Sequence, residues 1–193
     1  MRNDKKEWIL LRSTNIWFFG EGMLGPLLAV LTEKVGGDIL DISGAWAIFL
    51  FVTGVLTILI SYFADTKKGL TEKMMIWGYV LNAIFTFGYL LVDSPYKLFF
   101  VEAGLGIATA LANPTWDALY AKYEDRKHPA FTWGKAEGYH SITTAIAIIF
   151  GGIIVSYFSF NLLFIIMGII QIIAVISQIA LFRKYKRGYW AWI

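Results

Sequence analysis

The sequence predicts an all-α membrane protein with six transmembrane helices, and three observations support this fold class. Apolar residues make up 58% of the 193 residues and charged residues only 16%. A soluble domain of this size has too little interior to bury so much apolar surface, so lipid is the expected solvent. Six nearly uncharged runs of about 20 residues each have the length of a membrane-crossing helix. Fifteen of the seventeen Lys and Arg residues then fall on one side of the resulting map.

The six predicted spans follow one another with connections of unequal length. They cover residues 16–32, 43–64, 74–92, 96–120, 138–158 and 161–182. The last two spans come from a stretch of about 45 residues without formal charge, more than twice what one helix needs. Charged loops at 65–73 and 121–137 are predicted on one side of the membrane, and connections at 33–42, around 93–95 and at 159–161 on the other.

The distribution of basic residues predicts the orientation. One side receives Arg2, Lys5, Lys6, Arg12, Lys67, Lys68, Lys73, Lys122, Arg126, Lys127, Lys135, Arg183, Lys184, Lys186 and Arg187. The other side receives only Lys34 and Lys97. Because basic residues resist translocation, we expect the rich side to be cytoplasmic, with both termini inside and the protein in the cytoplasmic (inner) membrane.

Composition argues against several other classes of protein. The net charge of +3 is explained by the cytoplasmic loops, so nucleic acid is not an expected partner. The chain has no cysteine and two histidines, and its possible metal ligands are not clustered, so we expect no cofactor, no metal and no enzymatic activity. The polar first seven residues lead into a span without a small-residue cleavage site, unlike a secretory signal peptide.

Two short sequence patterns that occur twice suggest a repeat of three helices. The pattern Glu-x-x-Leu-Gly occurs at 21–25 in the first span and at 102–106 in the fourth. Ser-Tyr-Phe ends the second span at 61–63 and the fifth at 156–158. Three crossings per copy invert the second copy, and inverted three-helix repeats are a recurring plan of secondary transporters. Matches this short also arise by chance.

The glycines at positions 20, 22 and 25 spell the dinucleotide-binding pattern Gly-x-Gly-x-x-Gly. They lie inside an apolar helix with no preceding strand, so the phosphate-binding mechanism of that motif does not apply. We expect these glycines to allow close helix packing or local flexibility of the helix around Glu21.

The chain resembles one half of a Major Facilitator Superfamily transporter in span number, loop lengths and cytoplasmic termini. That family carries Gly-x-x-x-Asp-(Arg/Lys)-x-Gly-(Arg/Lys)-(Arg/Lys) after the second span. Here Ser61 replaces the first glycine and Asp65 matches the aspartate, followed by Thr66-Lys67-Lys68-Gly69. The order of glycine and basic residues therefore departs from the motif, and Asp65 is also consistent with a helix cap.

Members of the family normally have twelve spans in two halves that face each other across a cavity. The resemblance therefore implies a homodimer, with a two-fold axis along the membrane normal and the Asp65 loop meeting the partner's fifth span. A half-protein that pairs with a different chain, or a fragment of a longer transporter, has the same sequence pattern.

Two carboxylates inside predicted spans are the best candidates for solute or proton binding. A charge near the bilayer centre costs roughly 2.5–3.5 kcal/mol on insertion scales, so it usually faces a wet cavity or a partner. Glu21 lies halfway along the first span and Glu102 about two turns into the fourth, and the only Lys or Arg in either span is Lys97, at the outer end of the fourth. Proton binding is one interpretation; a neutral Glu hydrogen-bonded between helices is the other.

A second cluster is predicted at the cytoplasmic ends of the fourth and fifth spans. Proline removes a backbone hydrogen bond, so Asn113-Pro114 is expected to interrupt the fourth helix. Around this point lie Trp116, Asp117 and Tyr120, and the pair Glu137 and His140 opens the fifth span. With Arg126 and Lys127 they are predicted to form a cytoplasmic gate, or to act as ordinary interface anchors.

Amides and indoles within the spans are further candidates for a polar solute site. They are Asn15, Asn82, Gln171, Gln178, Trp17, Trp46 and Trp77. Sugar sites combine amide hydrogen bonds with aromatic faces, as do ordinary membrane cores. The leading hypothesis is a secondary transporter of a small polar solute, preferably a sugar, with proton coupling through Glu21 as the mechanism to test. The alternative is a membrane partner that does not itself transport.

Overall fold

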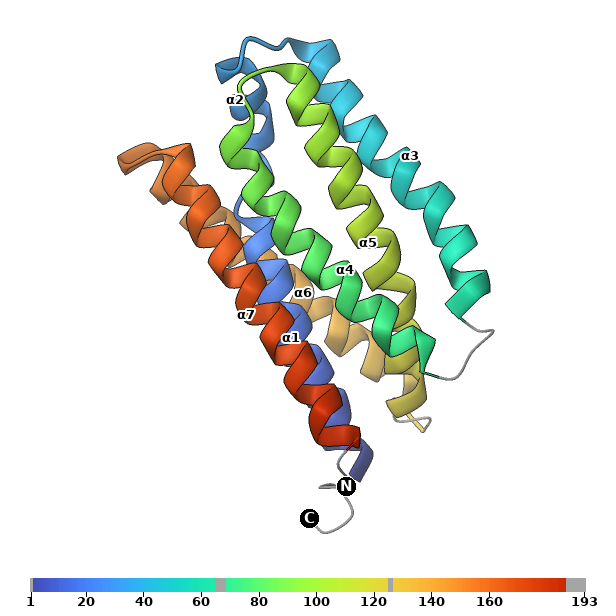
Figure 1. The fold of residues 1–193 in the computed structure, drawn as a ribbon. Coiled ribbons are helices and arrows are strands. Elements are labelled where there is room, and N and C mark those ends of the chain that lie inside the picture. Colours follow the sequence, from blue (N-terminus) through green and yellow to red (C-terminus); the bar gives the residue numbers. More distant parts are fainter. Residues whose placement is uncertain (1, 65–68, 125–126, 187–193) are drawn as a thin grey trace.

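The computed structural model describes residues 2–64, 69–124 and 127–186, which form helices and short connections without any strand. The elements are α1 (Arg2–Gly22), α2 (Leu27–Lys34), α3 (Ile39–Ala64), α4 (Leu70–Gly88), the 3-10 turn η1 (Tyr89–Leu91), α5 (Pro95–Tyr123), α6 (Pro129–Tyr157) and α7 (Phe160–Lys186). They form one elongated bundle in which α1 begins and α7 ends at the same end (Figure 1).

Five helices are long and apolar enough to cross a membrane, and α1 with α2 makes a sixth candidate span bent by 42°. The bend lies at the sequence Gly22-Met23-Leu24-Gly25-Pro26, where Leu24 N–H bonds the Glu21 carbonyl at 3.2 Å and α2 starts after Pro26. Proline at a helix start and glycine before it allow the chain to change direction there. Six spans are thus present when the bent pair is counted as one.

Helix α5 is the central element and packs along both α3 and α4. Small residues permit these contacts, since a Cβ at Gly78 would lie 2.8 Å from the Ala108 carbonyl oxygen. On the other side, a Cβ at Gly106 would lie 2.9 Å from the Phe49 carbonyl oxygen. Close backbone approach at small residues is typical of membrane helices, where lipid provides no hydrophobic drive between helices.

The expected interruption at Asn113–Pro114 is wrong, because α5 continues through Pro114 to Tyr123. Proline removes one backbone hydrogen bond, and packing on both flanks holds the helix together. The next residue adds side-chain bonds, since the Thr115 hydroxyl donates to the carbonyls of Leu111 at 2.6 Å and Ala112 at 2.9 Å.

The other half of the bundle has α1 at its centre, packed along α6 and α7, while α7 also packs along α4. Helices α1 and α6 approach closely at Gly151, where a Cβ would lie 1.9 Å from the Met23 carbonyl oxygen. The glycines of the first span serve packing, as expected, because Gly20 faces Gln171 and Gly22 faces Thr144 and Ala147.

Helices α3 and α6 lie at the flanks and are covered least by the rest of the chain. In their most apolar stretches 6% and 11% of the residues are buried, against 56% in α5. Their exposed side chains are large and apolar, including Phe51, Ile58, Ile142 and Ile149. These two faces are therefore available to lipid or to another protein.

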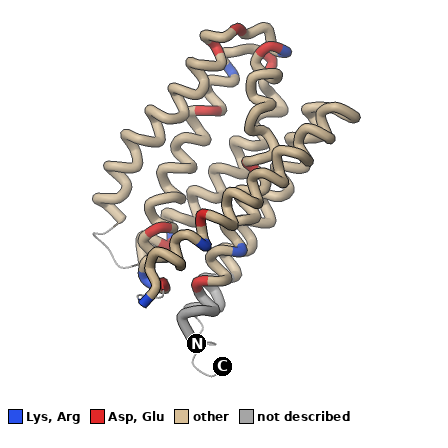
Figure 2. The backbone as a smooth tube through the Cα atoms, turned by 180° about the vertical axis from the view of Figure 1, so that it is seen from behind, with Lys and Arg blue, Asp and Glu red and all other residues tan. Residues whose placement is uncertain are grey.

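Several helices run beyond the predicted spans, because hydropathy stops at the first charges whereas helical hydrogen bonding continues into the interface. The predicted loop at 121–137 is the clearest error, since α5 reaches Tyr123 and α6 already begins at Pro129. Charged positions gather at the two ends of the bundle (Figure 2). At the end opposite the start of α1, Lys97 pairs with Asp93 at 2.5 Å and Lys34 lies over the Phe160 ring at 5.1 Å.

Candidate functional site

A cavity of about 510 Å³ opens between α1, α5 and α6, near the end of the bundle where α1 and α6 begin and α5 ends. A volume of this size suits a small-molecule ligand. The wall consists of Leu11, Thr14, Asn15, Trp17, Phe18, Tyr79, Asn113, Trp116, Asp117, Trp133, Gly134, Ala136, Glu137 and His140. Each of the three helices presents one face to it, with residues spaced three or four apart as on one side of a helix.

Aromatic rings form much of this wall and hold one another in place. Trp116 stacks on Tyr120 with centroids 4.7 Å apart and meets Trp133 edge-on at 6.5 Å. The Trp133 indole N–H donates to Glu124 at 2.6 Å, which fixes the second ring as well. Deeper in the bundle, Trp17 contacts Tyr79 edge-on at 4.3 Å. The aromatic part of the wall is therefore built before any ligand arrives.

Among the described residues, the acidic groups of the wall are two carboxylates, and no Lys or Arg contributes to it. Asp117 makes no hydrogen bond or ion pair with any residue in the described ranges. Glu137 has only His140 nearby, with 3.9 Å between its Oε1 and the imidazole Nδ1. The His140 ring stacks on Phe18 with centroids 3.5 Å apart. The cavity is thus acidic, and its charge is poorly compensated within the chain.

Two indole N–H groups beside the cavity also lack acceptors within the described part of the chain: those of Trp17 and Trp116. Trp17 is 3% exposed. Glu21 lies close to the Trp17 indole, but the two do not meet hydrogen-bond geometry. Buried donors without acceptors are uncommon and costly, which makes this wall a candidate for ligand contact.

The carboxylates predicted in the spans lie elsewhere, in the interior between α1, α4, α5 and α7. Glu21 sits just before the bend between α1 and α2 and accepts a hydrogen bond from the Asn82 side-chain N–H at 2.8 Å. Glu102 is 3% exposed and accepts a hydrogen bond from the Tyr89 hydroxyl at 2.6 Å. Gln171 donates to the Trp17 carbonyl at 3.1 Å. These polar groups form satisfied contacts between helices.

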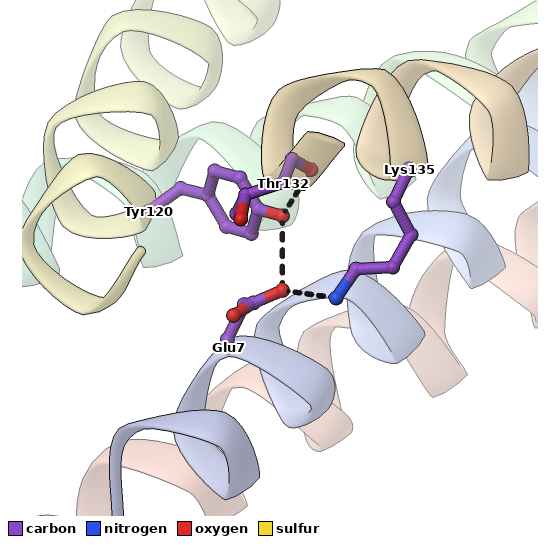
Figure 3. A network of polar contacts seen from close by, with 4 residues as sticks. All are labelled: Glu7, Tyr120, Thr132 and Lys135. Carbon is purple, nitrogen blue, oxygen red and sulfur yellow. Dashed lines mark hydrogen bonds and ion pairs between the residues drawn. The ribbon is translucent and has the colours of Figure 1, made fainter. Parts of the chain in front are cut away.

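A third polar cluster ties α1, α5 and α6 together beside the cavity (Figure 3). The buried Glu7 carboxylate pairs with the Lys135 ammonium at 2.5 Å. The fully buried Tyr120 hydroxyl donates to the Thr132 carbonyl at 2.9 Å and, more weakly, to Glu7 at 3.3 Å. These four residues hold the first turns of α1 and α6 against the last turn of α5.

Comparison with protein families decides what kind of molecule carries this cavity. A model of the Major Facilitator Superfamily matches residues 13–190, nearly the whole chain. The chain belongs to the Major Facilitator Superfamily. It is therefore an integral membrane protein of a transporter family, not of an enzyme family. The comparison with curated protein sequences finds no match.

In this superfamily member, the residues predicted to bind solute or protons are divided between two places. Asn15 and Trp17 line the cavity. Glu21, Glu102, Asn82 and Gln171 lie in the bundle interior, where each makes the contacts given above. Gln178 is fully buried there, and both of its amide atoms lack partners among the described residues. Trp46 and Trp77 are more than half exposed on the outside of the bundle.

Most of the residues predicted to form a gate line the cavity. These are Asn113, Trp116, Asp117, Glu137 and His140, while Pro114 lies within α5 next to Asn113. Asp65 lies outside the described residues, as does Arg126. The structure thus brings together two sequence clusters from α5 and α6 on one wall.

Trp133 and the Glu7–Lys135 pair were missed by the sequence analysis. Trp133, Glu137 and His140 are spaced by four and three residues, so they share one helix face. That spacing was available, but the predicted start of the span at 138 placed Trp133 in a loop. Glu7 and Lys135 are 128 positions apart, and no local pattern connects them.

Proposed function

We propose that the chain is a secondary transporter that carries a small polar solute by alternating access and works as a homodimer of six-span halves. The observation that carries the proposal is a family match to a transporter superfamily together with a cavity walled on one side by α1, α5 and α6. A solute that leaves on either side of the membrane needs a second wall that this half does not supply.

The pairing of helices supports an inverted repeat of three spans. The fourth span (α5) packs on the second (α3) and third (α4), and the first span (α1) packs on the fifth (α6) and sixth (α7). If spans one, two and three are exchanged with spans four, five and six, the contacts of α5 become the contacts of α1. The contact between the third and sixth spans maps onto itself. Inverted repeats of this kind place the solute site near the repeat interface.

The two least covered helices, α3 and α6, are the proposed dimer contacts. Both present exposed apolar faces, and α6 carries Gly134 and Gly138 one turn apart, with open space in front of both. Such spacing permits close approach of a second helix. Two copies related by a two-fold axis would enclose the cavity between them, with the Asp65 loop of each near the α6 of its partner. A different chain packed on these faces corresponds to the alternative, a half-protein that pairs with another membrane protein.

Proton coupling through Glu21, with Glu102 in support, is part of the proposal. Each of these carboxylates accepts a hydrogen bond from a neutral donor, and no Lys or Arg pairs with either among the described residues. A carboxylate without a cationic partner inside the membrane favours its neutral, protonated form. Glu21 also sits at the bend of the first span, where a change of charge can be linked to a change of helix angle.

The orientation follows the charge distribution, with both termini cytoplasmic in the inner membrane. The cavity then opens toward the cytoplasm. Its amides, Asn15 and Asn113, and its indole rings fit a sugar or another small polar molecule. Asn113, Trp116 and Asp117, predicted as a gate, are proposed here to contact the solute as well.

The first test is the mass of the protein in lipid, measured by native mass spectrometry over a dilution series. A persistent dimer of identical chains is the expected result. A strict monomer would contradict the homodimer and favour a half that pairs with another chain.

The second test is solute flux in proteoliposomes with Glu21→Gln. We expect this substitution to abolish proton-driven accumulation while solute exchange continues, because Gln keeps the hydrogen-bonding shape but takes up no proton. Glu33→Gln is the matched control, since Glu33 is exposed at the other end of the bundle. Unchanged accumulation in Glu21→Gln would remove the coupling role from this residue.

A further inference from the structure

We propose that the cavity between α1, α5 and α6 binds the cationic nitrogen of a small hydroxylated amine, with Asp117 as its counter-charge. The inference rests on the proposed function, because it takes this cavity to be the solute site of the transporter. It replaces the sugar preferred from sequence with a charged cargo of stated chemistry.

The strongest argument is that the Asp117 carboxylate has no hydrogen-bond or ion-pair partner among the described residues. This carboxylate lies on the cavity wall. Lys135, on the facing helix α6, is paired with Glu7 at 2.5 Å. A carboxylate in a partly desolvated cavity attracts a cation much more strongly than it would in water. Glu137, the second carboxylate of the wall, adds to the same field.

The aromatic wall suits an organic cation better than a metal ion. Trp17, Trp116 and Trp133 line the cavity, and indole rings are the side chains that bind ammonium groups best through their faces. Magnesium and calcium need several oxygen ligands. Among the described residues, no group of three His, Asp or Glu side chains is placed to hold a metal ion.

The unpartnered indole N–H of Trp116 adds an acceptor to the description of the ligand. Trp116 lines the cavity, and its buried Nε1 has no acceptor among the described residues. A hydroxyl oxygen on the amine would satisfy it. A neutral sugar would also supply oxygens, but it would place no positive charge beside Asp117 and Glu137.

The test compares ligands that differ only in charge, using isothermal titration of the purified protein in lipid nanodiscs. The pairs are choline with 3,3-dimethylbutan-1-ol, ethanolamine with ethylene glycol, and 4-aminobutan-1-ol with 1,4-butanediol, and glucose is included as the neutral sugar. We expect at least one cation to bind at least tenfold more tightly than its neutral partner. In Asp117→Asn this ratio should fall below threefold.

Asp117→Asn is expected to fold, because the carboxylate it replaces makes no contact that the substitution would break. Glu137→Gln is a second variant with a smaller expected loss, since Glu137 is the more exposed of the two and already faces His140. Glu33→Gln controls for loss of one negative charge far from the cavity. Equal binding within every pair, tightest binding of glucose, no binding of any cation, or an unchanged ratio in Asp117→Asn would each overturn the assignment.

Flux of the same compounds in proteoliposomes separates this inference from the proposed function. Uptake of glucose without binding of any cation would leave the transporter standing and overturn the cationic cargo. Charge-selective binding that depends on Asp117, without flux of any compound, would contradict the transporter and support the cation site.

Discussion

Two groups of carboxylates in the same bundle have opposite surroundings. In the interior, Glu7, Glu21 and Glu102 each have a partner: the Lys135 ammonium, the Asn82 amide and the Tyr89 hydroxyl, respectively. On the cavity wall, Asp117 has none among the described residues, and Glu137 has only a distant imidazole. The two groups differ in burial as well, since Glu7 and Glu102 are 4% and 3% exposed whereas Asp117 and Glu137 are both exposed.

This difference indicates two uses for the same functional group. A buried carboxylate with a complete set of contacts fixes one helix against another, because removing either partner leaves an uncompensated charge or donor. A carboxylate that the fold leaves without a partner is available to a ligand. The interior and the cavity wall should therefore respond differently to substitution, in stability for the first and in binding for the second.

The largest effect on stability is expected from breaking the cluster of Figure 3. Glu7→Ala leaves the Lys135 ammonium without its carboxylate and removes one acceptor of the Tyr120 hydroxyl. Breaking a buried ion pair costs 3–5 kcal/mol, and because Lys135 is 31% exposed we expect a loss of about 2–4 kcal/mol. The measurement is thermal unfolding in detergent, followed by tryptophan fluorescence.

Lys73→Met is the control for that experiment, because Lys73 is exposed and has no partner among the described residues. Its unfolding midpoint should stay near that of the parent protein. If Glu7→Ala also leaves the midpoint unchanged, the interior cluster does not hold the helices together, and the contrast with the cavity wall fails at its strongest point.

The second largest effect is expected from two adjacent glycines of α6, one facing the interior and the other facing open space. A Cβ at Gly151 would overlap the Met23 carbonyl oxygen of α1, at 1.9 Å, whereas a Cβ at Gly152 would meet nothing within 4 Å. Overpacking costs typically 1–3 kcal/mol. Gly151→Ala should therefore destabilise the protein by about that amount.

Gly152→Ala should be neutral or slightly stabilising, since alanine favours a helix by up to about 1 kcal/mol over glycine. Comparing the two thermal midpoints cancels the change in helix propensity and isolates the contact between α1 and α6. Equal midpoints would mean that this side of α6 is not packed closely against α1.

The sequence was sufficient for the fold class, because the features that decide it are local. Apolar runs longer than a bilayer crossing and charged segments between them predict spans without knowledge of any contact. The helix ends were harder to place. The start of α6 at Pro129 lies nine residues before the predicted 138, because helical hydrogen bonding does not stop where apolar residues stop.

The site could be predicted only in part, because it depends on which helices are neighbours. The residues around Asn113 and those around Glu137 were recognised as two clusters, and the structure places both on one cavity wall. That Asp117 lacks a partner while Glu102 has Tyr89 is a property of packing, and no spacing along the chain contains it. The same holds for Glu7 and Lys135, which meet only after α1 and α6 have packed.

The smallest effect is expected from a carboxylate that has a partner but no burial. Asp93 accepts a hydrogen bond from Lys97 at 2.5 Å in a fully exposed connection between η1 and α5. That hydrogen bond lowers the pKa of Asp93 below its ordinary value. The lowered pKa stabilises the folded protein at pH values above the ordinary pKa of the group, and this contribution is lost as the pH falls through the lowered pKa.

Because water and salt screen exposed pairs, Asp93→Asn should shift the unfolding midpoint at pH 7 by no more than about 1 °C, and less in high salt. A shift as large as that of Glu7→Ala would show that a partner alone stabilises a carboxylate here, whereas a negligible shift would mean that burial must accompany the partner.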